Sequence, residues 1–321
     1  MANVIGDDID FNAYLGMTDR DHKIIPASAY ADAVIDDFYG SQEVHGAYLP
    51  WAKTHGNIRF GKGQVTLWTG FNSHGKSLLL SQAVLSFVAQ GERVLVISPE
   101  MNPVALMARA VKQAAECAEP SVQFIRDFHA WTDKGIWLFN QMGMIDAKKI
   151  MAVCRYFAER HSGTHVVIDS LLKCGVSQDD FNAQHAFVNE LTSVARDTDL
   201  HIHLVAHSRK TACEDNIPSR FDVRGSGTIT DQVDCVLTVW RDKRHEANVA
   251  SGKARYEEKP GVLLACDKNR HHGWDGNIGL WFHQPSGQFC PDSRGKPLNL
   301  MSWPHQDRST DNGQTRKRSF E

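Results

Sequence analysis

The sequence Gly70-Phe71-Asn72-Ser73-His74-Gly75-Lys76-Ser77 has two glycines separated by four residues and followed by Lys and Ser. This pattern is typical of a phosphate-binding loop, in which backbone N–H groups close around phosphate oxygens. The loop needs a strand before it and a helix after it, because the helix N-terminus also attracts phosphate. Residues 64–69 form an apolar run, and residues 78–88 are rich in Leu, Val and Ala before Gly91. Both flanking elements are therefore predicted.

Two side chains of this loop have predicted contacts with a nucleotide. Lys76 is expected to reach the β and γ phosphates, and the Ser77 hydroxyl is expected to bind Mg²⁺. The alternative is a glycine-rich turn that binds nothing, which the flanking strand and helix disfavour. The residues predicted to hold the nucleotide are Gly70, Asn72, Ser73, His74, Gly75, Lys76 and Ser77.

The composition limits the class of protein. With Lys+Arg 35 and Asp+Glu 38 the net charge is -3, which argues against a protein that coats nucleic acid with its whole surface. The sequence has no apolar run of about 18 residues and no signal-peptide core, so a cytoplasmic protein that does not span a membrane is expected. Seven scattered cysteines without a C-x-x-C pair indicate reduced thiols rather than disulfides or a zinc site.

Strand and helix patterns alternate after Trp51, which is typical of a parallel sheet with crossover helices. Strands are expected at 64–69, 93–98, 136–139, 165–169, 202–207, 235–240 and 262–268, with an antiparallel finish at 276–282 and 287–289. The chain is predicted to be an α/β protein with helices on both faces of a mainly parallel, twisted sheet. Three regions are expected: an N-terminal arm at 1–45, the α/β domain at 46–290 and a polar, disordered tail at 291–321.

Three polar residues lie at or just after the carboxyl ends of predicted strands, where ligands of open α/β sheets bind, so they should gather at one side of the sheet. Asp169 is expected to hold Mg²⁺, and Glu100 is expected to activate the attacking water. His207 should lie near the terminal phosphate. The competing interpretations are a strand-end turn for Asp169 and a helix N-terminal acid for Glu100.

Five motifs in order resemble the ATPase core of ring-shaped replicative DNA helicases of the DnaB and Twinkle type, including phage primase-helicases. The resemblance covers about residues 51–289. Its elements are the phosphate loop, Ser98-Pro99-Glu100-Met101, Val167-Ile168-Asp169, Asp222-Val223-Arg224-Gly225-Ser226-Gly227 and Lys268-Asn269-Arg270.

This resemblance implies a RecA-like fold, a hexameric ring and Mg²⁺-dependent hydrolysis of ATP or another NTP or dNTP between subunits. It further implies translocation along single-stranded DNA, and it makes His207 the sensor of the γ-phosphate. A primase, a polymerase or a loader would be further partners. Two positions depart from the family pattern: His74 stands where many relatives have Gly, and Asp231 stands where relatives often have Gln.

Lys268 and Arg270 are two residues apart on a predicted strand, so they should point the same way. Fixed cations of this kind can stabilise charge on a phosphoryl group in the active site of a neighbouring subunit. A pair of solvated cations on an edge strand is the alternative.

DNA contacts are expected on the loops after the fourth and fifth strands. The long polar loop at 208–224 contains Arg209, Lys210, Arg220 and Arg224, and Lys173 lies on the shorter loop. Glu214 and Asp215 weaken this charge argument. The expected contact is a sequence-tolerant grip on phosphates.

Two classes of function follow from the sequence. The first is a helicase motor driven by NTP hydrolysis in replication. The second is a RecA-fold, DNA-dependent ATPase that acts as a recombinase or loader without unwinding. The arm helix at 27–38 either caps its own domain or docks on a neighbouring subunit.

Overall fold

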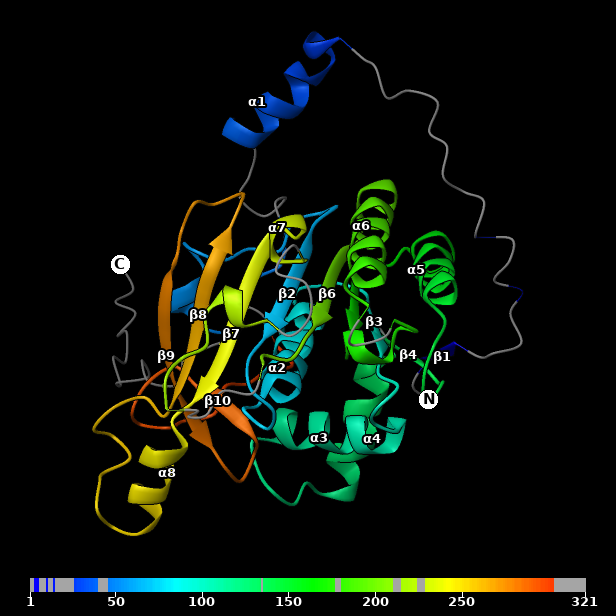
Figure 1. Ribbon diagram of the computed structural model, residues 1–321. Helices are drawn as coiled ribbons and strands as arrows, with labels where there is room; N and C mark the ends of the chain where they lie inside the picture. Colours follow the sequence, from blue (N-terminus) through cyan, green and yellow to red (C-terminus); the bar gives the residue numbers. More distant parts are fainter. Residues whose placement is uncertain are drawn as a thin grey trace, which may run out of the picture.

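The computed structural model describes residues 3–5, 10, 14, 26–39, 46–133, 135–176, 180–209, 215–223 and 229–302. The described chain forms a sheet with the strand order β1-β4-β3-β5-β6-β2-β7-β8-β9-β10 (Figure 1). The first seven strands in this order run parallel, and β8, β9 and β10 are each antiparallel to the strand before them. The predicted α/β class, with its mainly parallel sheet and antiparallel finish, is confirmed.

The strands agree closely with the apolar runs of the sequence, because central strands buried on both faces are apolar throughout. The parallel strands are β1 (Asn3–Ile5), β2 (Val65–Thr69), β3 (Val94–Ile97), β4 (Ile136–Phe139), β5 (His165–Ile168), β6 (His201–Val205) and β7 (Cys235–Arg241). The antiparallel strands are β8 (Val262–Asn269), β9 (Gly276–His283) and β10 (Gln288–Cys290).

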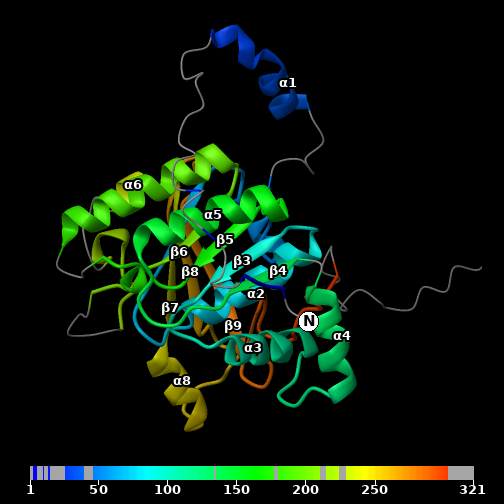
Figure 2. The same cartoon turned by 90° about the vertical axis from the view of Figure 1, so that its right-hand side faces the viewer.

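Helices cover both faces of the sheet, with α5 and α6 on one side and α3 and α4 on the other (Figure 2). Side chains fix several helix starts: Asn102 and Asp146 accept backbone N–H groups at the N-termini of α3 and α5. The helices are α1 (Ala31–Tyr39), α2 (Lys76–Ala89), α3 (Pro103–Ala115), α4 (Val122–Thr132), α5 (Ala147–His161), α6 (Phe181–Thr198), α7 (Ile229–Gln232) and α8 (Lys243–Ala250).

Two hydrophobic cores hold the layers together. One core joins α2, α3 and α4 to the sheet and contains the fully buried Trp68, Phe87 and Phe128. The other core joins α5 and α6 to the opposite face through residues such as Phe157 and Leu191. The sheet is thus fixed between two apolar layers, so the polar residues at its strand ends are held in place.

The segment after β10 differs from the predicted disordered tail. Residues 291–302 are described, and Leu298 and Leu300 belong to the core. Gln288 donates to the Leu298 carbonyl at 2.9 Å and accepts its N–H at 2.8 Å, so this segment is tied to β10. Residues 303–321 lie outside the described part of the chain.

Within the described residues, none of the helices is both long enough and apolar enough to cross a membrane. Cys154, Cys174, Cys235, Cys266 and Cys290 are buried free thiols, as the sequence predicts for its cysteines.

Candidate nucleotide site

The phosphate loop connects β2 to α2 and is built on backbone conformations that suit glycine. Gly70 has a φ of +137°, and a Cβ there would lie 2.2 Å from the Val239 carbonyl oxygen. Gly75 has a φ of +93° and is the N-cap of α2. The loop therefore packs directly on β7, and the first N–H groups of α2 face the position where phosphate binds.

Lys76 lies at the centre of the loop. Its Nζ donates to the carbonyls of Gly70 and Phe71, both at 2.8 Å. Burial lowers the pKa of Lys76 to about 8, and the nearby Asp169 and Glu100 carboxylates oppose this shift. A bound phosphate group would add negative charge beside this buried ammonium and oppose the shift further.

Two carboxylates converge on Lys76 because β3 and β5 are neighbouring parallel strands. Asp169 follows β5 and accepts a hydrogen bond from the Ser77 hydroxyl; burial raises its pKa, and this hydrogen bond opposes the rise. Glu100 follows β3, and its Oε1 accepts a hydrogen bond from Ser170 Oγ at 2.9 Å. Ser77 and Asp169 together offer hard oxygen ligands that fit Mg²⁺ beside a phosphate.

His207 lies two residues after β6, at the same edge of the sheet. The next residue is fixed to the phosphate loop, since the Ser208 N–H donates to the Gly70 carbonyl at 3.0 Å. The hydroxyls of Ser208 and Thr69 are also 3.2 Å apart. The structure therefore brings His207 to the loop together with Lys76 and the two carboxylates.

The side chain of His74 points into the protein rather than toward a ligand. It is fully buried, and its Nδ1 accepts the backbone N–H of Arg241 at 3.0 Å. Its ring also meets Phe71 edge-on, with 5.3 Å between centroids. His74 braces the loop against the end of β7, and its backbone N–H donates to the Phe71 carbonyl at 3.4 Å within the loop.

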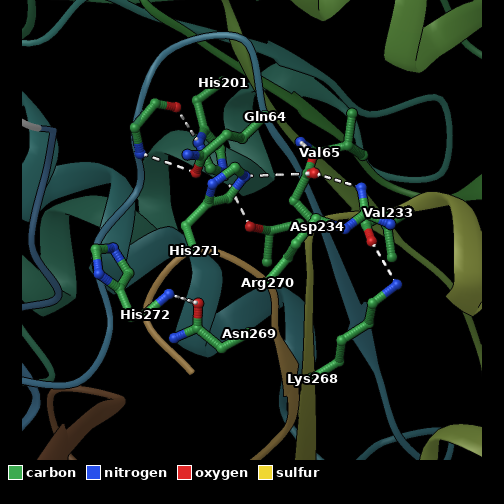
Figure 3. A network of polar contacts seen from close by, with 12 residues as sticks. Gln64, Val65, His201, Val233, Asp234, Lys268, Asn269, Arg270, His271 and His272 are labelled. Carbon is green, nitrogen blue, oxygen red and sulfur yellow. Dashed lines mark hydrogen bonds and ion pairs between the residues drawn. The ribbon is translucent and has the colours of Figure 1, made fainter. Parts of the chain in front are cut away.

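Lys268 and Arg270 lie beside the starts of β2 and β7, at the opposite end of the parallel strands from the phosphate loop. Figure 3 shows both side chains with Asp234. Arg270 Nη1 donates to Asp234 Oδ1 at 2.9 Å, and Asp234 Oδ2 accepts the N–H of Val65 at 2.9 Å. Val65 begins β2, whereas the loop follows the end of that strand, about 13 Å away at 3.3 Å per residue. The two cations therefore lie far from the phosphate loop of their own subunit.

The structure separates the predicted DNA-contacting residues into two places. Arg209 and Arg220 lie on a segment held by a bridge between Ser208 and Val223, and the Arg220 guanidinium stacks 4.9 Å from the Phe221 ring centroid. Lys173 instead lines a cleft with Glu100, close to the nucleotide site. Lys210 and Arg224 lie outside the described residues.

The sequence did not identify three polar residues that support the site. Ser170 holds Glu100, and Asp234 holds Arg270. Arg109 of α3 acts on Asp169 and favours its ionised form, while burial lowers the pKa of Arg109 itself. The position of Ser170 directly after Asp169 was an available signal, but no spacing pattern connects Asp234 or Arg109 with its partner.

Known proteins share this architecture. The family model of the DnaB-like helicase C terminal domain matches residues 54–290. The solved ATPase domain of G40P has a TM-score of 0.70 and 17% identity, with 83% of this chain and 98% of that chain covered. A DnaB-like replicative helicase, solved in a study of its interactions with primase, has a TM-score of 0.70 and 16% identity, with 83% and 68% covered. These structural likenesses show a common fold.

Proposed function

Because this chain belongs to the DnaB-like helicase C-terminal domain family, the NTP-hydrolysing motors of replicative DNA helicases, we propose that its nucleotide sites lie between subunits of a ring. The observation that carries this proposal is the separation of Arg270 from the phosphate loop of its own subunit. An arginine at that edge can serve a phosphate only on a neighbouring copy. Hexameric closure of such head-to-tail contacts would give every site one loop and one Lys268–Arg270 pair.

Each residue at the carboxyl ends of the strands has its own role in nucleotide binding or hydrolysis. Lys76 binds the β and γ phosphates of ATP or another NTP or dNTP, and Ser77 and Asp169 hold Mg²⁺. The metal, when bound, neutralises charge on the phosphate oxygens. Glu100, oriented by Ser170, accepts the proton of the attacking water, and His207 senses the γ-phosphate.

We propose that single-stranded DNA passes the loops of the ring that carry Arg209 and Arg220, with Lys210 and Arg224 as further contacts. The bridge between Ser208 and Val223 supports this role, because it presents both described arginines on one segment. Lys173 would contact DNA from the shorter loop beside Glu100, which would connect the strand directly to the hydrolysis site. Phosphate contacts of this kind give sequence-tolerant binding.

Assembly of the ring would use the N-terminal arm. The arm exposes four large apolar or aromatic side chains by 49 to 86%, namely Tyr30, Val34, Ile35 and Tyr39. Residues of α3 and α4, among them Val104 and Ile125, line an apolar pocket that also contains Lys112 and His129. Asp32 of the arm is also exposed, so both apolar and acidic residues of the arm complement this pocket on a neighbouring copy.

The described fold supports a motor domain that extends from residue 46 to residue 302, with residues before it as the assembly arm. A primase is the partner suggested by the helicase that was studied with one, and a polymerase or a loader would bind in the same replication setting. We expect the protein to act in the cytoplasm of a bacterial or phage-infected cell.

Two variants of the nucleotide site test the proposed function. Lys76→Ala should lose nucleotide binding and hydrolysis, because the main phosphate cation is removed. Glu100→Gln should bind nucleotide normally but lose hydrolysis by about a hundredfold or more, since a carboxamide cannot accept the proton from water. Equilibrium binding of a fluorescent nucleotide and phosphate release measure the two effects separately.

An assay of strand displacement from a forked DNA duplex distinguishes a helicase from a recombinase or loader. Wild-type protein should displace the strand only with hydrolysable nucleotide, and neither variant should do so. DNA-stimulated hydrolysis without displacement would favour the recombinase or loader. Hydrolysis by Lys76→Ala at the wild-type rate would show that residues 70–77 are not the phosphate-binding loop of the active site.

A further inference from the structure

A buried carboxylate holds Arg270 on its own subunit. Arg270 forms a 2.9 Å ion pair with Asp234 (Figure 3). Its Nη2 also donates to the Asp231 carbonyl at 3.0 Å. The Asp234 side chain is 6% exposed and the Arg270 side chain is 41% exposed. The arginine therefore lies at the surface end of an ion pair whose acidic member is inside the protein.

The Asp234 carboxylate cannot follow the arginine if the arginine moves. Its Oδ2 accepts the Val65 N–H at 2.9 Å, and the Asp234 N–H donates to the Val65 carbonyl at 2.9 Å. These two bonds tie Asp234 to the first residue of β2. Removal of the ion-pair partner of a buried carboxylate is unfavourable, so departure of Arg270 requires a substitute.

His271 is placed to be that substitute. Its Nε2 lies 3.5 Å from the same Oδ1 that Arg270 contacts, and its side chain is 44% exposed. Because it is adjacent to Arg270 in the chain, a turn that carries the arginine outward can bring the imidazole N–H onto the carboxylate. Asp234 thus has two alternative partners on one turn.

Helix α7 connects this contact to the predicted DNA-binding segment. Lys268 Nζ donates to the carbonyls of Thr230, Asp231 and Val233 at 2.8, 2.9 and 2.8 Å, which uses all three of its N–H donors. Both Lys268 and Arg270 thus bind the carbonyl of Asp231. Since α7 begins nine residues after Arg220, displacement of α7 would loosen both cations together.

We propose that Asp234 is a positioning residue that retains Arg270 on its own subunit, and that DNA binding at the segment carrying Arg209 and Arg220 displaces α7 and frees the arginine for the neighbouring nucleotide. This inference rests on the proposed role of Arg270 between subunits. Its consequence is that hydrolysis stays slow until DNA occupies the ring. Lys268, which donates to two carbonyls of α7 and to the carbonyl of Val233 that follows it, couples the same two elements.

The test is Asp234→Asn in the full-length, assembled protein, with hydrolysis measured with and without a single-stranded oligonucleotide. The amide keeps the size of the side chain and can still accept the Val65 N–H, but it cannot form an ion pair. DNA-independent hydrolysis should rise about tenfold, which corresponds to about 1.4 kcal/mol, and hydrolysis at saturating DNA should stay unchanged. Asp275→Asn, which removes an exposed carboxylate from the same β8–β9 turn, should change neither rate.

His271→Ala provides a second, opposite test, because a buried-site change such as Asp234→Asn can lower stability. This exposed substitution keeps the ion pair and removes the substitute partner. DNA-stimulated hydrolysis should fall severalfold while the DNA-independent rate stays the same. Unchanged stimulation in His271→Ala, or an unchanged DNA-independent rate in an Asp234→Asn variant that melts like wild type, would overturn the proposal.

Arg270→Ala distinguishes failure of this inference from failure of the proposed function. If Arg270→Ala hydrolyses nucleotide at the wild-type rate, the shared-site proposal itself is wrong. If Arg270→Ala is inactive and Asp234→Asn behaves as wild type, only the retaining role of Asp234 is refuted.

Discussion

Three histidines are buried in the sheet, and their hydrogen bonds fix their protonation. The Trp68 indole N–H, which can only donate, points to Nδ1 of His203 at 3.2 Å. His203 must therefore carry its proton on Nε2, which donates to His165 Nδ1 at 3.1 Å. His165 Nε2 is left to face Glu92 Oε2 at 3.7 Å. Trp68, His203 and His165 thus form a series of hydrogen bonds in which each group donates to the next, and both imidazoles are neutral. These bonds satisfy polar groups that would be costly to leave unpaired in the core.

His201 makes the stability of the protein depend on pH. Its Nδ1 donates to the Gly61 carbonyl at 2.7 Å, and burial lowers its pKa from 6.5 to about 4. Between these pH values the unfolded chain binds a proton that the folded protein does not, so stability falls as pH decreases from 6.5 toward 4. The expected loss from this residue is on the order of 3 kcal/mol. Denaturant unfolding at a series of pH values measures it.

His201→Asn is the matched variant, because its amide can still donate to Gly61. It should be less stable than wild type at neutral pH, with a shallower decline of the free energy of unfolding below pH 6.5. Equal slopes for the two proteins would assign the acid sensitivity to other groups. His165 and His203, whose pKa values burial also lowers, should account for the remaining slope.

At the scale of elements, buried strands were predictable and amphipathic helices were less so. Strand β4 has the bounds that the apolar run at 136–139 indicates. Helix α6 was not predicted, because its buried residues, such as Phe187 and Leu191, alternate with Asn, Gln, Glu and Asp. The burial of Leu298 depends on Gln288 and on a surface formed by distant segments, which local composition cannot reveal.

The residues of the nucleotide site were also only partly predictable from the sequence. Glu100 and Asp169 were predictable because each follows an apolar strand and parallel strands end at one edge. The pairing of Asp234 with Arg270 was not, since it depends on the register between β7 and β8. That register includes an irregularity between Val236 and Leu237, which no spacing in the sequence encodes.

The arm helix gives a prediction about assembly. Ile35→Asp places a charge on the exposed apolar surface of α1, and Ile125→Asp places one in the pocket between α3 and α4. Each should prevent ring formation, because a charge buried without a partner in that contact is unfavourable. Multi-angle light scattering should show monomers or short oligomers for both variants.

Met144→Asp is the control, since Met144 is also exposed, by 64%, but does not line the pocket. It should assemble as wild type does. Full-sized rings in both Ile35→Asp and Ile125→Asp would exclude docking of the arm in this pocket. Loss of assembly in only one of them would mean that the arm and the pocket have different partners.

At the scale of the whole molecule, the sheet separates the two halves of the proposed active site. The phosphate loop follows the carboxyl end of β2, and Arg270 is tied through Asp234 to the first residue of that strand. A single subunit therefore presents a loop on one side and an arginine on the other. The geometry suits a ring in which each contact completes one site.

Rings assembled from two different variants test directly whether the phosphate loop and the arginine of one site come from different subunits. Arg270→Ala subunits keep the phosphate loop and lack the arginine, whereas Lys76→Ala subunits keep the arginine and lack a working loop. Each protein alone should be nearly inactive, because arginine fingers are typically worth about a thousandfold or more in rate. In an equal mixture about one contact in four joins an intact loop to an intact arginine if subunits combine at random. DNA-stimulated hydrolysis measured against the mixing ratio should therefore peak near equal proportions.

Subunit exchange must be shown separately, by energy transfer between labelled subunits, so that an absent peak has a defined meaning. A flat, inactive profile despite exchange would contradict independent shared sites. Titration of wild type with Arg270→Ala then identifies the reason, because independent sites lose activity in proportion to the variant, whereas strictly sequential firing loses it much more steeply. Full-rate hydrolysis by isolated monomers would exclude the shared site, since a monomer has no neighbour to supply the arginine.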